Sequence, residues 1–278
     1  MSTDTHGRVT GRDPDDDPLL VVARFEGRNR LRMTAVLAVL FSLFGLLYVW
    51  VGPQMIDAGF SELLDAMPPV VTELFGFESL ESIEGLLASE FYTLGWIVGL
   101  GGYLAYTAAG TVAGDLRDER MDTVLSGPVP RRSVLLGKFL AVLVPIAALN
   151  VVVPVVLYVA SLTIGESLSV VDLAIVHAFS IPYLLFWSAG GILLGVVVRR
   201  GRAAGRVALG LLFFSWLFES VISTTEYDWL GALSPVRYFD PPGILVDGTY
   251  DIAGAGLLLA GAVVALGLGQ YWFRRRDL

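Results

Sequence analysis

Residues Gly114 to Lys138 read GDLRDERMDTVLSGPVPRRSVLLGK and connect two long apolar runs. This connection carries acids and bases together, and Ser126-Gly127-Pro128 interrupts it. A charged segment that is held at both ends by membrane helices can transmit a push, because moving the loop must move the helices attached to it. We therefore interpret the stretch as a cytoplasmic docking element for a soluble partner.

The composition indicates a membrane protein. Of the 278 residues, 55% are hydrophobic and only 17% are charged, whereas a soluble domain of this size needs more charge to cover its surface. The net charge of -8 is set largely by clusters outside the apolar runs, so it says little about a substrate. The chain has no cysteine, which excludes disulfides, thiolate metal sites and cysteine nucleophiles.

Six apolar runs approach the roughly 20 residues that a helix needs to cross about 30 Å of hydrocarbon. Backbone polar groups in lipid must be satisfied within their own segment, and the runs lack the alternation of barrel strands. The sequence therefore predicts an all-α integral membrane protein. We place its spans at residues 33–51, 91–113, 139–162, 173–198, 207–222 and 252–273.

The positive charges predict the orientation of these spans. If the spans alternate in direction, all 19 Lys and Arg residues except Arg237 fall on one side, and that side is the cytoplasm. The fifth run is the shortest and contains Glu219, but omitting it would place Arg274 to Arg276 outside. We therefore predict six spans with both termini cytoplasmic.

The chain divides into a tail and a membrane domain. Residues 1–17 are rich in Asp, which predicts a disordered acidic tail, and we expect residues 18–278 to form a single transmembrane domain. Apolar residues and arginines alternate irregularly from Pro18 to Arg32, as is typical of a helix lying in the membrane interface. A simple charged flank of the first span is the alternative.

Two outer connections differ in character. The first, Gly52 to Glu90, has apolar residues at helical spacing around Pro68-Pro69 and Gly76, which predicts short amphipathic helices. The third, Ser223 to Asp251, contains three prolines, and we expect it to be mostly irregular.

Few residues inside the spans could carry chemistry. Glu219 lies three residues from the outer end of its span, where helix capping or snorkelling competes with a role in a translocation pathway. Asn150, with Pro145 and Pro154 nearby, is a second pathway candidate, because it can hydrogen-bond across a helix interface. For His177, near the outer start of the fourth span, we favour an interfacial or packing role over a ligand or proton-relay role.

Close helix approach has a sequence signal of its own. Three pairs of glycines have the spacing that lets helix backbones approach one another, and they are Gly95/Gly99, Gly110/Gly114 and Gly191/Gly195. Such pairs arise easily in glycine-rich spans.

No nucleotide site is visible in the chain. Gly137-Lys138 could end a phosphate-binding loop, but Phe139 stands where Ser or Thr belongs and Arg132 stands where the first Gly belongs. We find no metal-ligand motif and no catalytic constellation either. The sequence therefore predicts a protein that is no enzyme and holds no cofactor or metal, so that energy for transport would enter through another chain or an ion gradient.

The central loop resembles that of the permease subunits of ABC-2 type transporters, which include the NosY-like branch. The residues that carry the resemblance are Ala113-Gly114-Asp115, Leu125 to Arg131 and Gly137-Lys138. One departure is Glu119-Arg120-Met121, where the family pattern has Gly-Thr-Leu. The resemblance implies that an ATPase docks on Asp115, Arg117, Asp118, Glu119, Arg120, Asp122, Pro128, Arg131 and Arg132.

The resemblance also implies a function. The chain would be the permease subunit of an ATP-driven transporter, embedded in the lipid bilayer of the cell membrane. We expect this transporter to be an exporter. Two permease copies, or this chain and a related one, would pair and bind two cytoplasmic ABC ATPase subunits, with no nucleic acid partner. The alternatives are a gradient-driven carrier or channel, which would need ionisable residues at mid-membrane that this chain almost lacks, and a membrane enzyme or structural subunit. For the acids of the central loop, the alternative to docking an ATPase is that they form a solvent-exposed face whose negative charges are balanced by Arg117 and Arg120.

Overall fold

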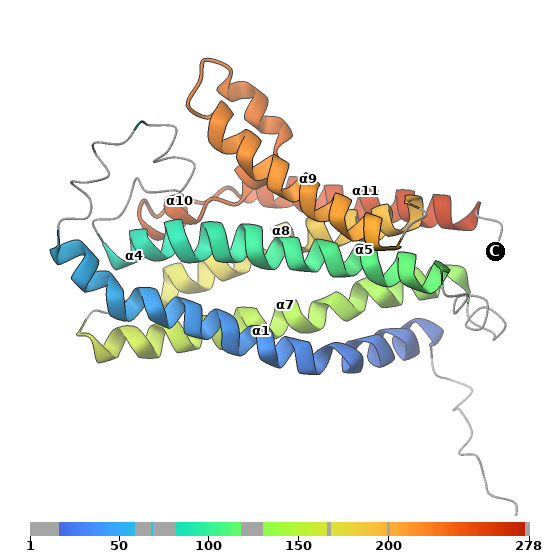
Figure 1. Ribbon diagram of the computed structural model, residues 1–278, viewed down its shortest axis with the longest axis horizontal. Coiled ribbons are helices and arrows are strands. Elements are labelled where there is room, and N and C mark those ends of the chain that lie inside the picture. The colour runs from blue at the N-terminus through green and yellow to red at the C-terminus, as the bar shows by residue number, and fades with distance from the viewer. Residues whose placement is uncertain are drawn as a thin grey trace, which may run out of the picture.

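The computed structural model describes residues 17–58, 68, 82–117, 130–165, 168–198 and 201–275. In these ranges all regular structure is helical and no strand occurs. Six helical stretches are long and apolar enough to cross a membrane, and most of them run side by side along the long axis of the molecule (Figure 1). The prediction of an all-α membrane protein with six spans is confirmed.

The elements follow one another in a simple order. The first span is α1 (Pro18–Asp57), and the second is the continuous run of α4 (Ile83–Leu86), η2 (Leu87–Leu100) and α5 (Gly101–Arg117). The remaining spans are α7 (Arg131–Thr163), α8 (Val170–Val197), α9 (Gly201–Ile222) and α11 (Ile252–Arg274). Three short elements separate the last two spans, and they are η3 (Asp228–Leu233), η4 (Pro235–Tyr238) and α10 (Pro241–Leu245).

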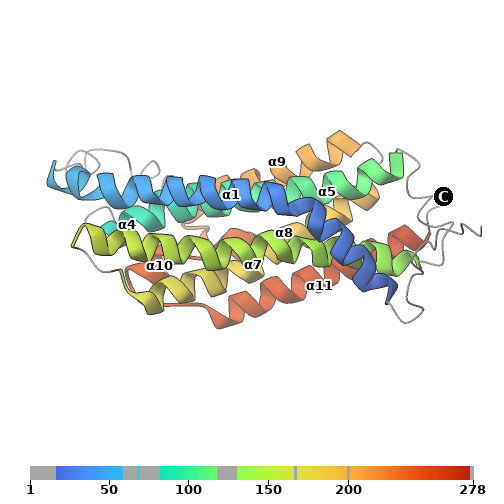
Figure 2. The ribbon, with the colours of Figure 1, turned by 90° about the horizontal axis from the view of Figure 1, so that it is seen from below.

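The segment that we expected to lie in the interface is the first part of α1. Pro18 occupies the first turn and the Asp17 side chain accepts a hydrogen bond from the Leu19 N–H at 3.0 Å, so the helix begins where the sequence predicts. No residue ends it before the first span, however, and α1 continues to Asp57. Figure 2 shows that this first part bends away from the rest of α1 and crosses α7.

The third outer connection has more structure than we expected. Two of its three short helices, η4 and α10, and the start of α11 are each capped by a side chain that accepts a hydrogen bond from a backbone N–H two or three residues later. These side chains are Ser234, which accepts from Val236, Asp240, which accepts from Gly243, and Asp251, which accepts from Gly254. The amphipathic helices expected in the first outer connection fall outside the described residues, apart from α4.

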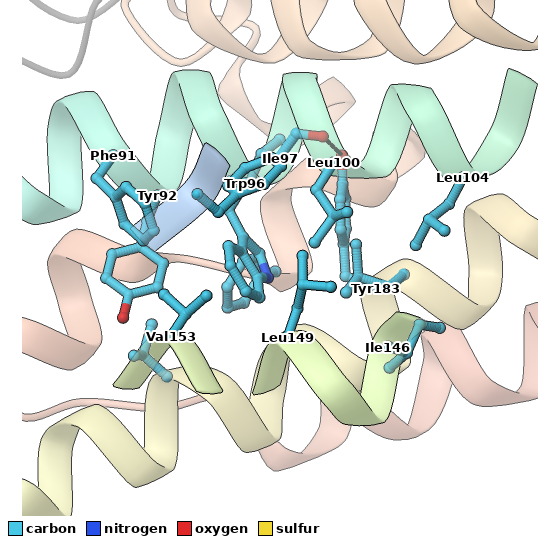
Figure 3. Close-up of a cluster of buried hydrophobic side chains, with 14 of the residues drawn as sticks. Phe91, Tyr92, Trp96, Ile97, Leu100, Leu104, Ile146, Leu149, Val153 and Tyr183 are labelled. Atoms are coloured by element: carbon cyan, nitrogen blue, oxygen red, sulfur yellow. Dashed lines mark hydrogen bonds between the residues drawn. The ribbon is translucent and has the colours of Figure 1, made fainter. Parts of the chain in front are cut away.

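The core lies where η2, α7 and α8 meet (Figure 3). Tyr92 and Trp96 of η2 and Tyr183 of α8 are fully buried there, and the Tyr183 hydroxyl donates a hydrogen bond to the Ile97 carbonyl at 3.4 Å. η2 is wound as a π-helix over its whole length, a conformation that is rare and often found at functional sites. The aromatic side chains therefore fix this unusual segment against two neighbouring spans.

One of the three glycine pairs brings two helix backbones into close contact, whereas Gly95 of the first pair faces the Phe44 ring of α1. A Cβ atom at Gly195 would lie 2.5 Å from the Ala109 carbonyl oxygen of α5, and one at Gly191 would collide with the Ala105 carbonyl oxygen. A Cβ atom at Gly110 or Gly114 would meet nothing within 4 Å. The pair Gly191/Gly195 therefore sets the approach of α8 to α5.

Candidate functional site

The predicted docking loop joins α5 to α7 at the end of the bundle where α1 begins and α11 ends (Figure 1). Residues 118–129 lie outside the described residues, and they include Asp118, Glu119, Arg120, Asp122 and Pro128. Of the other docking candidates, Asp115 and Arg117 belong to the last turn of α5, and Arg131 and Arg132 to the first turn of α7. Both helices continue from this end through the membrane, so the loop joins two spans directly.

The first turns of α7 are held by α1. Lys138 is 3% exposed, and its Nζ lies 2.5 Å from Oε1 of Glu26 in the bent part of α1. Beside it, a Cβ atom at Gly137 would lie 2.7 Å from Cγ1 of Val22, so only glycine lets α1 cross so closely. The Gly-Lys pair that begins the third span is therefore the point where α1 crosses α7.

A second contact holds the same end of α7. The Gln270 side chain of α11 donates a hydrogen bond from Nε2 to the Arg132 carbonyl at 3.0 Å. The helix that follows the docking loop is thus connected to both the first and the last span. We had not singled out Glu26 or Gln270 from the sequence, although Glu26 is the one acid in the basic stretch from Arg24 to Arg32.

Asn150 lies inside the bundle and is hydrogen-bonded to α8 directly and to η2 through His177. Its Oδ1 accepts a hydrogen bond from the Ser180 Oγ at 2.9 Å and lies 3.0 Å from Nδ1 of His177. The other ring nitrogen of His177 lies 3.0 Å from the Tyr92 hydroxyl. An amide oxygen can only accept, so Nδ1 carries the proton and Nε2 accepts from Tyr92.

This arrangement assigns His177 a packing role. It is buried, and the Trp96 ring meets it edge-on with the ring centroids 4.9 Å apart. The neutral ring and its two partners connect η2, α7 and α8 within one chain. Sequence reasoning identified Asn150 and His177 separately, but it had no signal that they contact each other.

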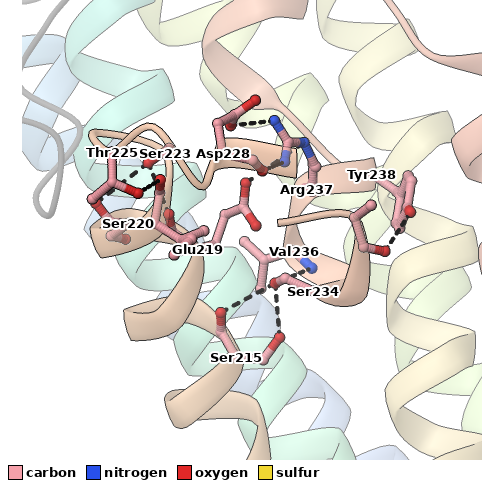
Figure 4. Close-up of polar contacts among 12 residues, drawn as sticks. Ser215, Glu219, Ser220, Ser223, Thr225, Asp228, Ser234, Val236, Arg237 and Tyr238 are labelled. Carbon is pink, nitrogen blue, oxygen red and sulfur yellow. Dashed lines mark hydrogen bonds and ion pairs between the residues drawn. The ribbon is translucent and has the colours of Figure 1, made fainter. Parts of the chain in front are cut away.

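Glu219 lies at the outer end of α9 among polar groups from the following connection (Figure 4). Its Oε1 is 3.8 Å from Nε of Arg237, the one base that the sequence places outside. The Arg237 guanidinium also donates to the carbonyl and the carboxylate of Asp228. The ion pairs of Arg237 therefore fold the connection back onto α9.

Glu219 also lines a cavity of about 460 Å³ between η2, α9 and α10. Asp240 and Asp247 line it too, together with Arg237 and several hydroxyl groups. Burial raises the pKa of Asp240, the Gly243 N–H lowers it in part, and Asp247 raises it further. The cavity can receive a polar or charged group at the outer end of the bundle. Among the described residues no cluster of His, Asp and Glu is able to hold a metal ion.

Comparison with known families assigns the whole membrane domain. The model of the family described as "ABC-2 family transporter protein" matches residues 20–278, which include all six spans and the central loop. Comparison with curated proteins gives no match. The match covers far more than half of the chain. The chain therefore belongs to the ABC-2 transporter family and is a multi-pass membrane permease of an ABC transporter.

Proposed function

We propose that this permease is the membrane half of an ATP-driven exporter of the cell membrane, energised by a separate ATPase that docks on residues Asp115 to Arg132. The observation that carries the proposal is the family match, because it includes the loop together with the two spans that the loop joins. Within the family we assign the chain to the NosY-like branch, on the loop residues Ala113-Gly114-Asp115 and Pro128-Val129.

The contacts at the start of α7 give the docking loop a mechanical connection. The ion pair between Lys138 and Glu26 and the hydrogen bond from Gln270 to the Arg132 carbonyl link α7 to α1 and α11. When an ATPase displaces the loop, α7 moves with it, and these two contacts transfer the displacement to the first and last spans. Packed helices respond to such displacements by switching between discrete arrangements.

Glu219 is our candidate for the outer end of the translocation pathway. It lines the polar cavity on the side opposite the docking loop, together with Asp240 and Asp247. Asn150 remains the mid-membrane candidate, and in the present conformation its hydrogen bonds face the interior of one chain. Two permease copies, or this chain and a related permease, complete the pathway between them.

The test is reconstitution of the purified permease with the ATPase that copurifies from its native membrane. The permease alone should hydrolyse no ATP, and the complex should hydrolyse ATP at a rate that depends on the permease. Native mass spectrometry of the complex should give two copies of the permease component. A homo-oligomer that transports on an ion gradient without ATP would refute the proposal and support the carrier alternative.

A further inference from the structure

A second cavity lies between α8 and α9 and has a volume of about 580 Å³. Figure 1 shows α9 leaning away from α8 and α11 toward its outer end, where the chain turns back through η3 and η4. α8 contributes Phe186, Trp187 and Gly190 to the lining, and α9 contributes Leu211, Phe214 and Phe218. Residues at the junction of η3 and η4 line it as well.

The cavity exists because α8 has a glycine on the side that faces it. A Cβ atom at Gly190 would meet nothing within 4 Å, whereas one at the adjacent Gly191 would collide with the Ala105 carbonyl oxygen of α5. Gly191 is therefore needed for helix packing, and Gly190 is not. The absence of a side chain at Gly190 leaves space that a larger residue would fill.

The lining is suited to an apolar ligand. No charged residue lines the cavity, and its two serine hydroxyls, on Ser215 and Ser234, are hydrogen-bonded to each other at 2.9 Å. A large cavity with an apolar lining is the usual form of a small-molecule site. The remaining polar group of the lining side chains is the buried indole N–H of Trp187, so a charged or strongly polar ligand would lose its hydration there with little compensation.

The position of the cavity determines which apolar molecule reaches it. Leu211 and Phe214 line the cavity and are 48% and 63% exposed, within a span that crosses the hydrocarbon. The cavity therefore opens onto the exposed surface of α9 within the membrane-crossing part of the chain. A helix of a second copy is about 10 Å wide and would fill 580 Å³ within roughly 7 Å of its length, which is too short a contact to seat a span.

We propose that the cavity between α8 and α9 binds one acyl chain of a membrane lipid. The chain enters from the bilayer beside Phe214 and packs against the aromatic rings and the open face of Gly190. In this position it fills the space between α9 and α8 and supports the leaning position of α9.

The experiment uses the full-length permease in phosphatidylcholine vesicles that contain a small fraction of phosphatidylcholine with a diazirine on one acyl chain. After illumination, peptide mass spectrometry measures labelling of α8 and α9 relative to the exposed face of α1. Gly190→Leu fills the cavity and should reduce labelling of the lining residues about tenfold, equivalent to roughly 1.4 kcal/mol of binding. Gly210→Leu is the matched control, since a Cβ atom there also meets nothing within 4 Å but Gly210 does not line the cavity.

Both substitutions replace a helical glycine with a better helix former, so the variants should keep their helix content by circular dichroism. A second pair repeats the test without glycine: Leu211→Trp fills the cavity, and Leu217→Trp places the same ring on α9 outside the lining. Equal labelling in the cavity-filling variants and their controls would overturn the proposal. So would labelling of the wild-type cavity no stronger than that of the face of α1, or cross-linking of the lining to a second permease chain.

Discussion

Lys138 and Glu26 form an ion pair across the first and third spans, with Nζ and Oε1 2.5 Å apart. Lys138 is the only lysine of the chain, and Glu26 lies 112 positions away in the sequence. The pair connects the first helix to the helix that follows the docking loop. Removing one partner of a buried pair is costly because the remaining, mostly buried charge loses the counter-charge that lies in contact with it.

We therefore expect Lys138→Met to lower the free energy of unfolding by about 3 kcal/mol, at the lower end of the usual range because Glu26 keeps partial exposure. The double variant Glu26→Leu/Lys138→Met should recover part of this loss, because the carboxylate that lost its partner is removed as well, although the nearby Arg30 then loses a neighbouring negative charge. Unfolding in detergent measures both values. Arg24→Gln, at an exposed neighbouring position, is the control. Equal losses in the single and double variants would show that the two charges are not coupled.

The hydrogen bonds of Asn150 predict a second stability effect. Asn150→Leu leaves the His177 Nδ1–H without its acceptor, which should cost about 1–3 kcal/mol of unfolding free energy. Adding His177→Phe and Tyr92→Phe removes the other two side chains of this chain of hydrogen bonds, while the Ser180 hydroxyl keeps its bond to the carbonyl of residue 177, and should restore part of the loss. Asn29→Leu, at an exposed position in α1, should change the unfolding free energy little. If Asn150→Leu costs no more than Asn29→Leu, the network does not stabilise the bundle.

The buried position of Asp240 predicts a pH effect. Its pKa is raised in the folded protein, so this residue favours folding at low pH, and that contribution is lost as the pH rises through the folded pKa. Asp240→Asn keeps an oxygen that can accept from the Gly243 N–H and removes the charge. The variant should be more stable than the wild type at neutral pH, and the difference should vanish in acid.

Melting temperatures measured from acid to neutral pH give this difference, because the raised pKa of Asp240 moves the titration of its carboxyl in the folded protein toward neutral pH. Asp228→Asn is an unsuitable control because Arg237 binds Asp228, whereas Glu226→Gln changes an exposed acid nearby. A stability difference between Asp240→Asn and wild type that stays constant with pH would contradict the assignment.

The number of spans could be predicted from the sequence, because the length of an apolar run reflects the thickness of the bilayer. Their direction, which rests on the side of the arginines, remains a prediction. The helices nevertheless extend beyond the apolar runs, as in α1 and α7, because helical hydrogen bonding continues past the hydrocarbon wherever no residue stops it. A cap at Asp17 marks one end, and we found that boundary correctly.

The contacts between spans could not be predicted from a single sequence. Tyr92 and His177 are 85 positions apart, and all faces of these spans are apolar enough to be buried or to face lipid. Hydrophobic periodicity therefore does not identify which faces meet. The docking role of Asp118, Glu119, Arg120, Asp122 and Pro128 remains a prediction, since they lie outside the described residues.

The charge distribution predicts which positions are reachable from outside the cell. Thr249→Cys and Glu226→Cys, both exposed at the outer end, should react with a membrane-impermeant maleimide in a chain that has no other thiol. Asn29→Cys is also exposed but lies on the side predicted to be cytoplasmic, and it should react only after the membrane is opened. Ser133 would be a poor inner probe because it is buried. Labelling of Asn29→Cys in intact cells would contradict the six-span topology.

The charges of the docking loop give the sharpest test of the proposed function. If the loop acids form only a solvated face, each exposed pair is worth roughly 0 to 1 kcal/mol, and reversing one charge should matter little. If the acids are desolvated against an ATPase, losing one partner of a buried pair costs about 2 to 5 kcal/mol of binding. The two expectations barely overlap.

We therefore expect Glu119→Lys or Asp115→Lys to weaken association with the ATPase by at least about tenfold, or roughly 1.4 kcal/mol, while insertion and folding are unchanged. Binding of the purified ATPase to reconstituted permease, titrated at low and high salt, gives the affinity. Glu78→Lys and Glu81→Lys make the same charge change in the first outer connection and should leave binding unaltered. If both loop reversals bind the ATPase as tightly as the wild type at both salt concentrations, the loop is not the docking element. The exposed arginines of the first part of α1, between Pro18 and Arg32, are then the next surface to test.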